Sequence, residues 1–316
     1  MALHTGYNSQ LMISFLRLIR WPNLLLVILT QYLLRYCILL PAFTAEYFIT
    51  GVFPSCLSNF QFAILVFSTV ALAAGGYIIN DYYDTVIDAI NKPEKVIIGK
   101  TISERTALQC YGLLTAAGIL AGFYLAFVIR KPVMGFVNVF VAASLWMYST
   151  QLKKKLLVGN ILIALLSALT LLVVGLFEPE FYRNFLFLAV YAGFAFLLSL
   201  TREIVKDMED LEGDERGQVK SLPVRFGLKK TKVVVLVLIV ITAWLLGNVL
   251  FNAFYISTVF NFWNILIGCE LPFAVLLFLV ATATEKKDFR FISRVEKVIM
   301  LLGILSLIPL YYYYIR

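Results

Sequence analysis

Charged residues are scarce in this sequence, and the shortage decides its class. Only 15% of the 316 residues are charged, whereas 61% are hydrophobic. A soluble domain carries about 25% charged and about 45–50% apolar residues, because most of its surface must be wetted. The composition therefore excludes an ordinary soluble protein and predicts an integral membrane protein.

Metal-binding histidines and paired cysteines are also missing. His4 is the single histidine, and the four cysteines form no CxxC or Cys/His spacing. A zinc site and a disulfide framework are therefore not expected. The net charge of +8 does not indicate nucleic acid, because the basic residues fall between apolar segments. The first apolar run is long enough to span the membrane and is longer than the apolar part of a cleavable signal peptide, so no signal peptide is expected.

Long apolar segments are abundant. A helix needs roughly 20 apolar residues to cross a bilayer, and the sequence contains nine segments of about that length. They lie at about 21–43, 60–80, 106–129, 132–149, 156–177, 184–203, 231–252, 258–283 and 295–315. The third and fourth are separated only by a short break at 130–132, which predicts a tight helical hairpin. We therefore expect an all-α, multi-pass membrane bundle of nine transmembrane helices.

The basic residues predict the orientation of these helices. With the N-terminus in the cytoplasm, most of the 27 Lys and Arg residues fall on the cytoplasmic side, as the positive-inside rule requires. The sequence thus predicts an inside N-terminus and an outside C-terminus. Two charged residues, Arg35 and Glu270, lie within predicted spans. Such residues are candidates for function, and their roles stay open at this stage.

Two acidic clusters interrupt the apolar pattern. The first closes the second span and reads NDYYDTVID, and the second closes the sixth and reads DMEDLEGD. In each, aspartates stand at i, i+3 and i+7, positions that fall within an arc of roughly 60° on a helix. The spacing predicts three carboxylates on one helix face per cluster: Asp81, Asp84 and Asp88, then Asp207, Asp210 and Asp214.

Three like charges on one face repel one another, so a cation must compensate them. Hard oxygen ligands suit Mg²⁺, which carboxylates typically hold together with substrate phosphates. The predicted topology puts both clusters at the cytoplasmic membrane face. We therefore expect them to hold Mg²⁺ ions with a diphosphate between them, and Asn80 to add a neutral ligand or a hydrogen bond to phosphate. One such cluster alone would fit a solvated helix end; the pair carries the interpretation.

At these residues the sequence resembles the UbiA family of intramembrane prenyltransferases, whose pattern is NDxxDxxxD in one loop and a DxxD-xxxD-like motif in a later one. The resemblance covers essentially the whole chain. A closer similarity is to the family's digeranylgeranylglyceryl phosphate synthase branch, in the stretches NDYYDTVIDAINKPEKVIIGKTISERTA and REIVKDMEDLEGDERGQVKSLPVRFG. Two differences stand out: Lys95-Val96-Ile97 replaces a frequent Arg-Pro-Ile, and Ser221-Leu222-Pro223 replaces Thr-Leu-Pro.

The resemblance implies a single domain over residues 1–316, with the helices around a central cavity capped by polar loops. It implies an isoprenyl diphosphate donor held by Mg²⁺ and a lipophilic acceptor in the lipid bilayer of the cell membrane. Similarity to the named branch favours geranylgeranyl transfer to the hydroxyl of a prenylglyceryl phosphate, which forms an ether lipid. An aromatic acceptor, as in quinone, haem or chlorophyll biosynthesis, is the alternative. A transporter is disfavoured, because its charged site would lie near the bilayer midplane.

The motifs also imply roles for individual residues. All six aspartates are expected in the metal site, with Asp84 and Asp210 as the catalytic pair. Lys153 ends the stretch YSTQLK, which resembles a family motif, and is expected to be catalytic. Tyr82 and Tyr83 are candidates for shielding a carbocation. Substrate binding is expected of Asn23, Asn80, Lys92, Lys95, Tyr148, Arg202 and Lys206.

Overall fold

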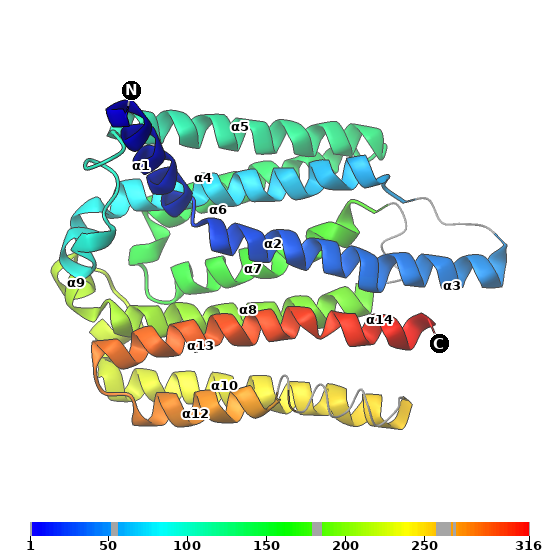
Figure 1. Cartoon of the computed structure of the whole chain (residues 1–316). Helices are drawn as coiled ribbons and strands as arrows, with labels where there is room; N and C mark the ends of the chain where they lie inside the picture. Colours follow the sequence, from blue (N-terminus) through cyan, green and yellow to red (C-terminus); the bar gives the residue numbers. More distant parts are fainter. Residues whose placement is uncertain (1, 52–55, 179–184, 257–266, 268–269, 316) are drawn as a thin grey trace. The chain divides into compact units, whose positions relative to one another are not determined.

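The computed structural model describes residues 2–51, 56–178, 185–256, 267 and 270–315 (Figure 1). Helices make up most of this part of the chain, and the described residues contain no strand beyond an isolated bridge between Ile98 and Ile102. The predicted all-α class is confirmed. Seven helical stretches within the described residues are long and apolar enough to cross a membrane.

The chain divides into two compact units. Unit 1 comprises Met1–Ile28, Leu57–Lys155 and Glu212–Val219, and unit 2 comprises Leu29–Cys56, Leu156–Leu211 and Lys220–Arg316. The first aspartate cluster lies in unit 1. The second is divided, because Asp207 and Asp210 belong to unit 2 whereas Asp214 belongs to unit 1.

Unit 1 is built on three long antiparallel helices. Its elements are α1 (Ala2–Leu18), α4 (Asn59–Asn91), η2 (Pro93–Lys95), α5 (Glu104–Val128), η3 (Pro132–Met134), α6 (Gly135–Thr150), η4 (Leu152–Lys154) and α9 (Leu211–Arg216). Helix α4 packs along α5 and α6, and α5 packs on α6 across a short connection, which confirms the predicted hairpin (Figure 1). Ser68 of α4 donates a 2.7 Å hydrogen bond to the carbonyl of Gly118, so the helices approach closely there.

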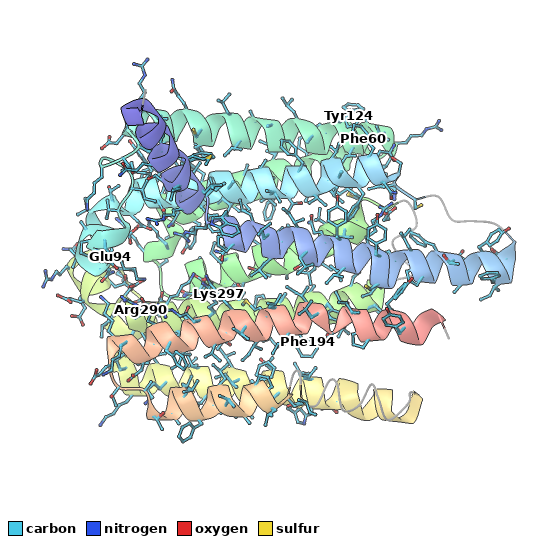
Figure 2. The ribbon with its side chains drawn as sticks, viewed as in Figure 1. Phe60, Glu94, Tyr124, Phe194, Arg290 and Lys297 are labelled. Atoms are coloured by element: carbon cyan, nitrogen blue, oxygen red, sulfur yellow. The ribbon has the colours of Figure 1, made fainter. Side chains whose placement is uncertain are left out.

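Helix α4 carries the first motif beyond its apolar part. A capping box begins the helix, in which Ser58 and Gln61 satisfy each other's backbone N–H groups. Its 33 residues extend about 50 Å, whereas the hydrocarbon core is about 30 Å thick. Glu94, just past the helix, lies at the end of unit 1 opposite Phe60 and Tyr124 (Figure 2). The motif therefore occupies a polar extension of a spanning helix.

Unit 2 is built around α8. Its elements are the second half of α2 (Trp21–Leu34), η1 (Arg35–Leu39), α3 (Leu40–Thr50), α7 (Val158–Leu176), α8 (Phe185–Glu209), α10 (Leu222–Ile256), α12 (Leu271–Thr282), α13 (Lys286–Leu305) and α14 (Leu307–Ile315). Helix α8 packs against α7, α10 and α13. Val205 and Met208 of α8 and Phe289 and Ile292 of α13 share one buried cluster.

Several predicted spans differ from the helices. The first predicted span continues to Thr50, and the ninth is divided between α13 and α14. The eighth, 258–283, lies partly outside the described residues, and α12 is its described part. Helix α1 was not predicted. The count of nine spans therefore stays a prediction.

The charge in the first span has a buried partner. Arg35 Nη1 donates a 2.9 Å hydrogen bond to Glu178 Oε1, and the side chains are only 2% and 1% exposed. Removing one member of such a buried pair costs about 3–5 kcal/mol, because the other charge is left uncompensated. We assign Arg35 a structural role. Glu270 directly precedes α12, and its role stays open.

Candidate active site

The first aspartate cluster lies on one uninterrupted helix, as its spacing predicted. Asp81, Asp84 and Asp88 all belong to α4 and are partly buried. Two cations from other elements compensate the acids. Arg20 Nη2 donates a 2.7 Å hydrogen bond to Asp81 Oδ1, and Lys153 Nζ donates one to Asp84 Oδ1. The expected repulsion between the acids is thus relieved within unit 1 itself.

Arg20 is a site residue that the sequence did not reveal. It lies in the turn between α1 and α2, with a φ of 51°, and its guanidinium stands 4.8 Å from the ring centroid of Tyr77. Burial on its own lowers the pKa of the Arg20 guanidinium, but the attraction and hydrogen bond of Asp81, together with Tyr77 and Asp88, outweigh burial and raise that pKa. Asn23, predicted to bind substrate, donates to the Tyr77 hydroxyl at 3.3 Å. Arg20, Asn23, Tyr77 and Asp81 therefore form one polar group.

Lys153 lies where the sequence motif placed it, directly after α6. It belongs to the short helix η4, and the side chains of Lys153 and Asp84 are only 11% and 17% exposed. Tyr148, the other predicted residue of this stretch, is partly buried near the end of α6. The segment that follows α6 thus supplies the cation that pairs with Asp84, the middle acid of the first motif.

A small pocket adjoins the acidic face of α4. It is lined by Asp81, Thr85 and Asp88 of the helix and by the loop residues 96–98. Lys92 directly follows α4 as its C-cap, and its backbone N–H donates to the carbonyl of Asp88. Lys95 was also predicted to bind substrate, but its side chain is not among those that the structure describes. Two of the three acids of the first motif therefore face a hollow.

The second aspartate cluster is not on one helix. Helix α8 ends at Glu209 and α9 begins at Leu211, so the chain bends at Asp210 and the predicted single face is wrong here. A tertiary contact accompanies the bend. The Gly213 N–H donates to Asn91 Oδ1 at 3.0 Å, and a Cβ on Gly213 would stand 2.2 Å from Asn91 Nδ2. Glycine permits this approach, which joins the segment of Asp214 to the end of α4.

The charged residues before the bend are ordered by a glutamate. Arg202 Nη1 and Lys206 Nζ both donate to Glu203 Oε1, at 3.2 and 2.5 Å. Asp207 accepts a 2.9 Å hydrogen bond from Asn160 of α7, a residue that sequence reasoning missed. The predicted substrate cations of α8 therefore share one carboxylate oxygen.

The donor atoms of the first motif fit a hard divalent cation. They are carboxylate and amide oxygens, which Mg²⁺ prefers. Asn80 Oδ1 is buried and has no hydrogen-bond partner in the described part of the chain, so it can coordinate a cation or accept a hydrogen bond. The described residues contain no group of three His, Cys, Asp or Glu side chains close enough to hold a metal ion. A bound ion would therefore draw further ligands from water or from substrate phosphates.

Comparison with known proteins places the chain in a family. The sequence profile described as the UbiA prenyltransferase family matches residues 38–311. The digeranylgeranylglyceryl phosphate synthase of Methanosphaera stadtmanae is 32% identical over 238 residues, which are 75% of this chain and 83% of that protein. The enzyme of the same name from Methanothermobacter thermautotrophicus is 38% identical over 208 residues, 63% of this chain and 69% of its own.

Solved structures show the same fold. A structure of digeranylgeranylglyceryl phosphate synthase in membranes aligns with a TM-score of 0.65 at 23% identity, covering 95% of this chain and 99% of that one. A UbiA homologue from Archaeoglobus fulgidus bound to GPP and Mg²⁺ aligns with a TM-score of 0.54 at 17% identity, covering 93% and 99%. This chain is therefore a membrane prenyltransferase and belongs to the UbiA prenyltransferase family.

Proposed function

We propose that this enzyme transfers an isoprenyl group, with Mg²⁺, from its diphosphate to the hydroxyl of a prenylglyceryl phosphate. The donor is geranylgeranyl diphosphate, the acceptor is lipophilic, and the product is an ether lipid. The observation that carries the proposal is the first motif. It presents three acids on one helix, with Arg20 and Lys153 paired to two of them.

The two cations paired with the first motif can also serve the substrate. Ions bound at Asp81 and Asp84 would neutralise the negative charge that attracts Arg20 and Lys153. The two cations would then turn to the phosphate oxygens that accompany the metal. Charge-assisted hydrogen bonds to phosphate are about as strong as those to carboxylate, so the exchange costs little.

The roles proposed for individual residues follow this scheme. Asp84 and Asp210 are the central metal ligands, and Lys153 acts on the leaving group. The remaining ligands are Asp81, Asp88, Asp207 and Asp214. The substrate-binding residues are Asn23, Asn80, Lys92, Lys95, Tyr148, Arg202 and Lys206, to which the structure adds Arg20.

The reaction breaks the bond between the allylic carbon and the diphosphate oxygen. It forms an ether bond from that carbon to the acceptor oxygen, and it releases pyrophosphate and the hydroxyl proton. Bound Mg²⁺ supplies electrostatic stabilisation for the charge that develops on the leaving pyrophosphate. Lys153 and Arg20 add positive charge at the same group. The rings of Tyr82 and Tyr83, 5.3 Å apart and edge to face, offer π-faces to an allylic cation.

Topology and organisation are part of the proposal. We propose nine spans with the N-terminus in the cytoplasm, a single catalytic domain over residues 1–316, and both motifs at the cytoplasmic face of the cell membrane. The apolar helices and the basic connecting segments support this arrangement. The helices of this proposed fold surround a central cavity.

The names of the relatives support the choice of substrates. The two relatives compared above in sequence are digeranylgeranylglyceryl phosphate synthases, and a structure with the same fold contains GPP and Mg²⁺. The motif residues themselves recognise the diphosphate and its metal. They do not distinguish a glyceryl phosphate from an aromatic acceptor, so an experiment has to distinguish these two acceptors.

Membranes containing the enzyme should be incubated with labelled geranylgeranyl diphosphate and either geranylgeranylglyceryl phosphate or an aromatic acid. We expect ether formation and stoichiometric pyrophosphate release with the glyceryl phosphate alone, and neither after addition of EDTA. Transfer to the aromatic acid alone would show that the acceptor is aromatic and not a glyceryl phosphate. Solute flux without pyrophosphate release would indicate a transporter instead.

A further inference from the structure

A buried polar cluster lies in unit 2, where α13 packs on α8. The two helices share an apolar seam that includes Ile204 and Ile292. Charged residues lie along the same seam. Arg290, near the start of α13 (Figure 2), donates a 3.1 Å hydrogen bond from Nε to Glu209 Oε1 of α8. Glu296 follows further along α13 and is completely buried.

Glu296 is the unexplained member of this cluster. Its side chain is 0% exposed, and neither carboxylate oxygen has a hydrogen-bond partner among the described residues. The charged groups that act on it are Arg202, Glu203 and Lys206 of α8. A buried carboxylate without donors costs several kcal/mol. Native proteins keep few such groups, and each requires a reason.

Arg202 offers the matching donor. Its Nε is also buried and has no hydrogen-bond partner within the described part of the chain. Its Nη1 reaches Glu203 at 3.2 Å, on the oxygen that Lys206 also uses. The cluster thus contains two cations on one carboxylate oxygen, beside a second carboxylate that neither uses. Arg202 is among the charged groups that act on Glu296, and its unsatisfied Nε–H is the kind of donor that the carboxylate lacks.

We propose that Glu296 is a positioning residue for Arg202. Its carboxylate accepts from the Nε side of the guanidinium when an anionic substrate enters, so that Arg202 is fixed between Glu203 and Glu296. The planar guanidinium has five N–H donors and can serve two carboxylates and a phosphate at once. Lys206 then turns from Glu203 to the same phosphate. The inference rests on the proposed function, because the anion is the phosphate of its substrate.

A double-mutant cycle tests this role. The proteins are the unmodified enzyme, Glu296→Leu, Arg202→Gln and the double variant. Leucine is apolar and of similar size, and it replaces a buried carboxyl group that has no hydrogen-bond partner among the described residues, so thermal melting in detergent should show a folded protein. We expect each single variant to lose about tenfold or more in kcat/KM. The double variant should be no worse than Arg202→Gln, because the two residues act as one.

The exposed Arg294 of the same helix provides the control, and Arg294→Gln should keep the unmodified rate. Normal kcat/KM in Glu296→Leu would overturn the proposal, as would a double variant whose losses multiply. If Glu296→Leu does not fold, Glu296→Gln takes its place with the same expectations. If the unmodified enzyme transfers no prenyl group, the proposed function fails. In that case the same four proteins are titrated with magnesium pyrophosphate in a calorimeter. The positioning role is overturned if the unmodified enzyme does not bind it, or if the binding free energies lost in the two single variants add up in the double variant.

Discussion

The two aspartate motifs have the same spacing but different local structures. The first lies on a single helix, and cations from distant parts of the chain hold Asp81 and Asp84. The second bends at Asp210, and its Asp207 accepts from the neutral amide of Asn160. The two motifs therefore share their aspartate spacing but not the backbone conformation that carries it. We infer that the first motif is a preformed acidic face, whereas the second depends on its packing partners.

The largest effect is expected when one aspartate is removed, from either motif. Asp84→Ala and Asp210→Ala should each reduce transfer by about 1,000-fold or more, because each deletes a ligand that stabilises the leaving group. Asp84→Ala should also lower thermal stability, since it leaves the largely buried Lys153 without its acceptor. Radiolabelled transfer and melting in detergent measure the two effects. Glu104→Gln, on an exposed face of α5, is the control; near-normal turnover in either alanine variant would remove the metal-site assignment.

An intermediate effect tests the packing of the second motif. Gly213→Ala places a Cβ 2.2 Å from Asn91 Nδ2, so either the Asn91 side chain moves and gives up its hydrogen bond to the Gly213 N–H, or α9 shifts and carries Asp214 with it. We expect a loss of about 1–3 kcal/mol in stability and roughly 10- to 100-fold in kcat. Gly112→Ala, where no atom lies within 4 Å of the new Cβ, should be neutral or stabilising. Equal behaviour of the two variants would show that the contact with Asn91 is unimportant.

The smallest effects compare the partners of the two motifs. Arg20→Gln removes a charged partner of Asp81 and should lower kcat/KM by about tenfold, as expected for a charge-assisted contact. Asn160→Ala removes a neutral partner of Asp207 and should cost about fivefold, or about 1 kcal/mol. Steady-state kinetics at varied donor concentration gives kcat/KM for each variant, so the two losses can be compared. A larger loss for Asn160→Ala than for Arg20→Gln would reverse the comparison between the motifs.

Local sequence predicted those features that depend on local physics. Composition predicted a membrane protein, apolar segments predicted most long helices, and the aspartate spacing predicted the helical face of the first motif. The bend at Asp210 could not be predicted, because it accompanies a contact between Gly213 and Asn91, 122 positions apart. Arg20 was missed for the same reason, since its partner Asp81 is 61 positions away. Glu296 carries no motif at all, and only its burial reveals it.

We propose that both motifs hold the same diphosphate through Mg²⁺. Calorimetric titration of magnesium pyrophosphate into the unmodified enzyme, Asp84→Ala and Asp210→Ala tests it most directly. If the claim is right, the unmodified enzyme binds pyrophosphate only with Mg²⁺, and each single variant loses that binding although it remains folded. Unchanged Mg²⁺-dependent binding in either variant would show that its motif does not hold the diphosphate, and it would contradict the shared site.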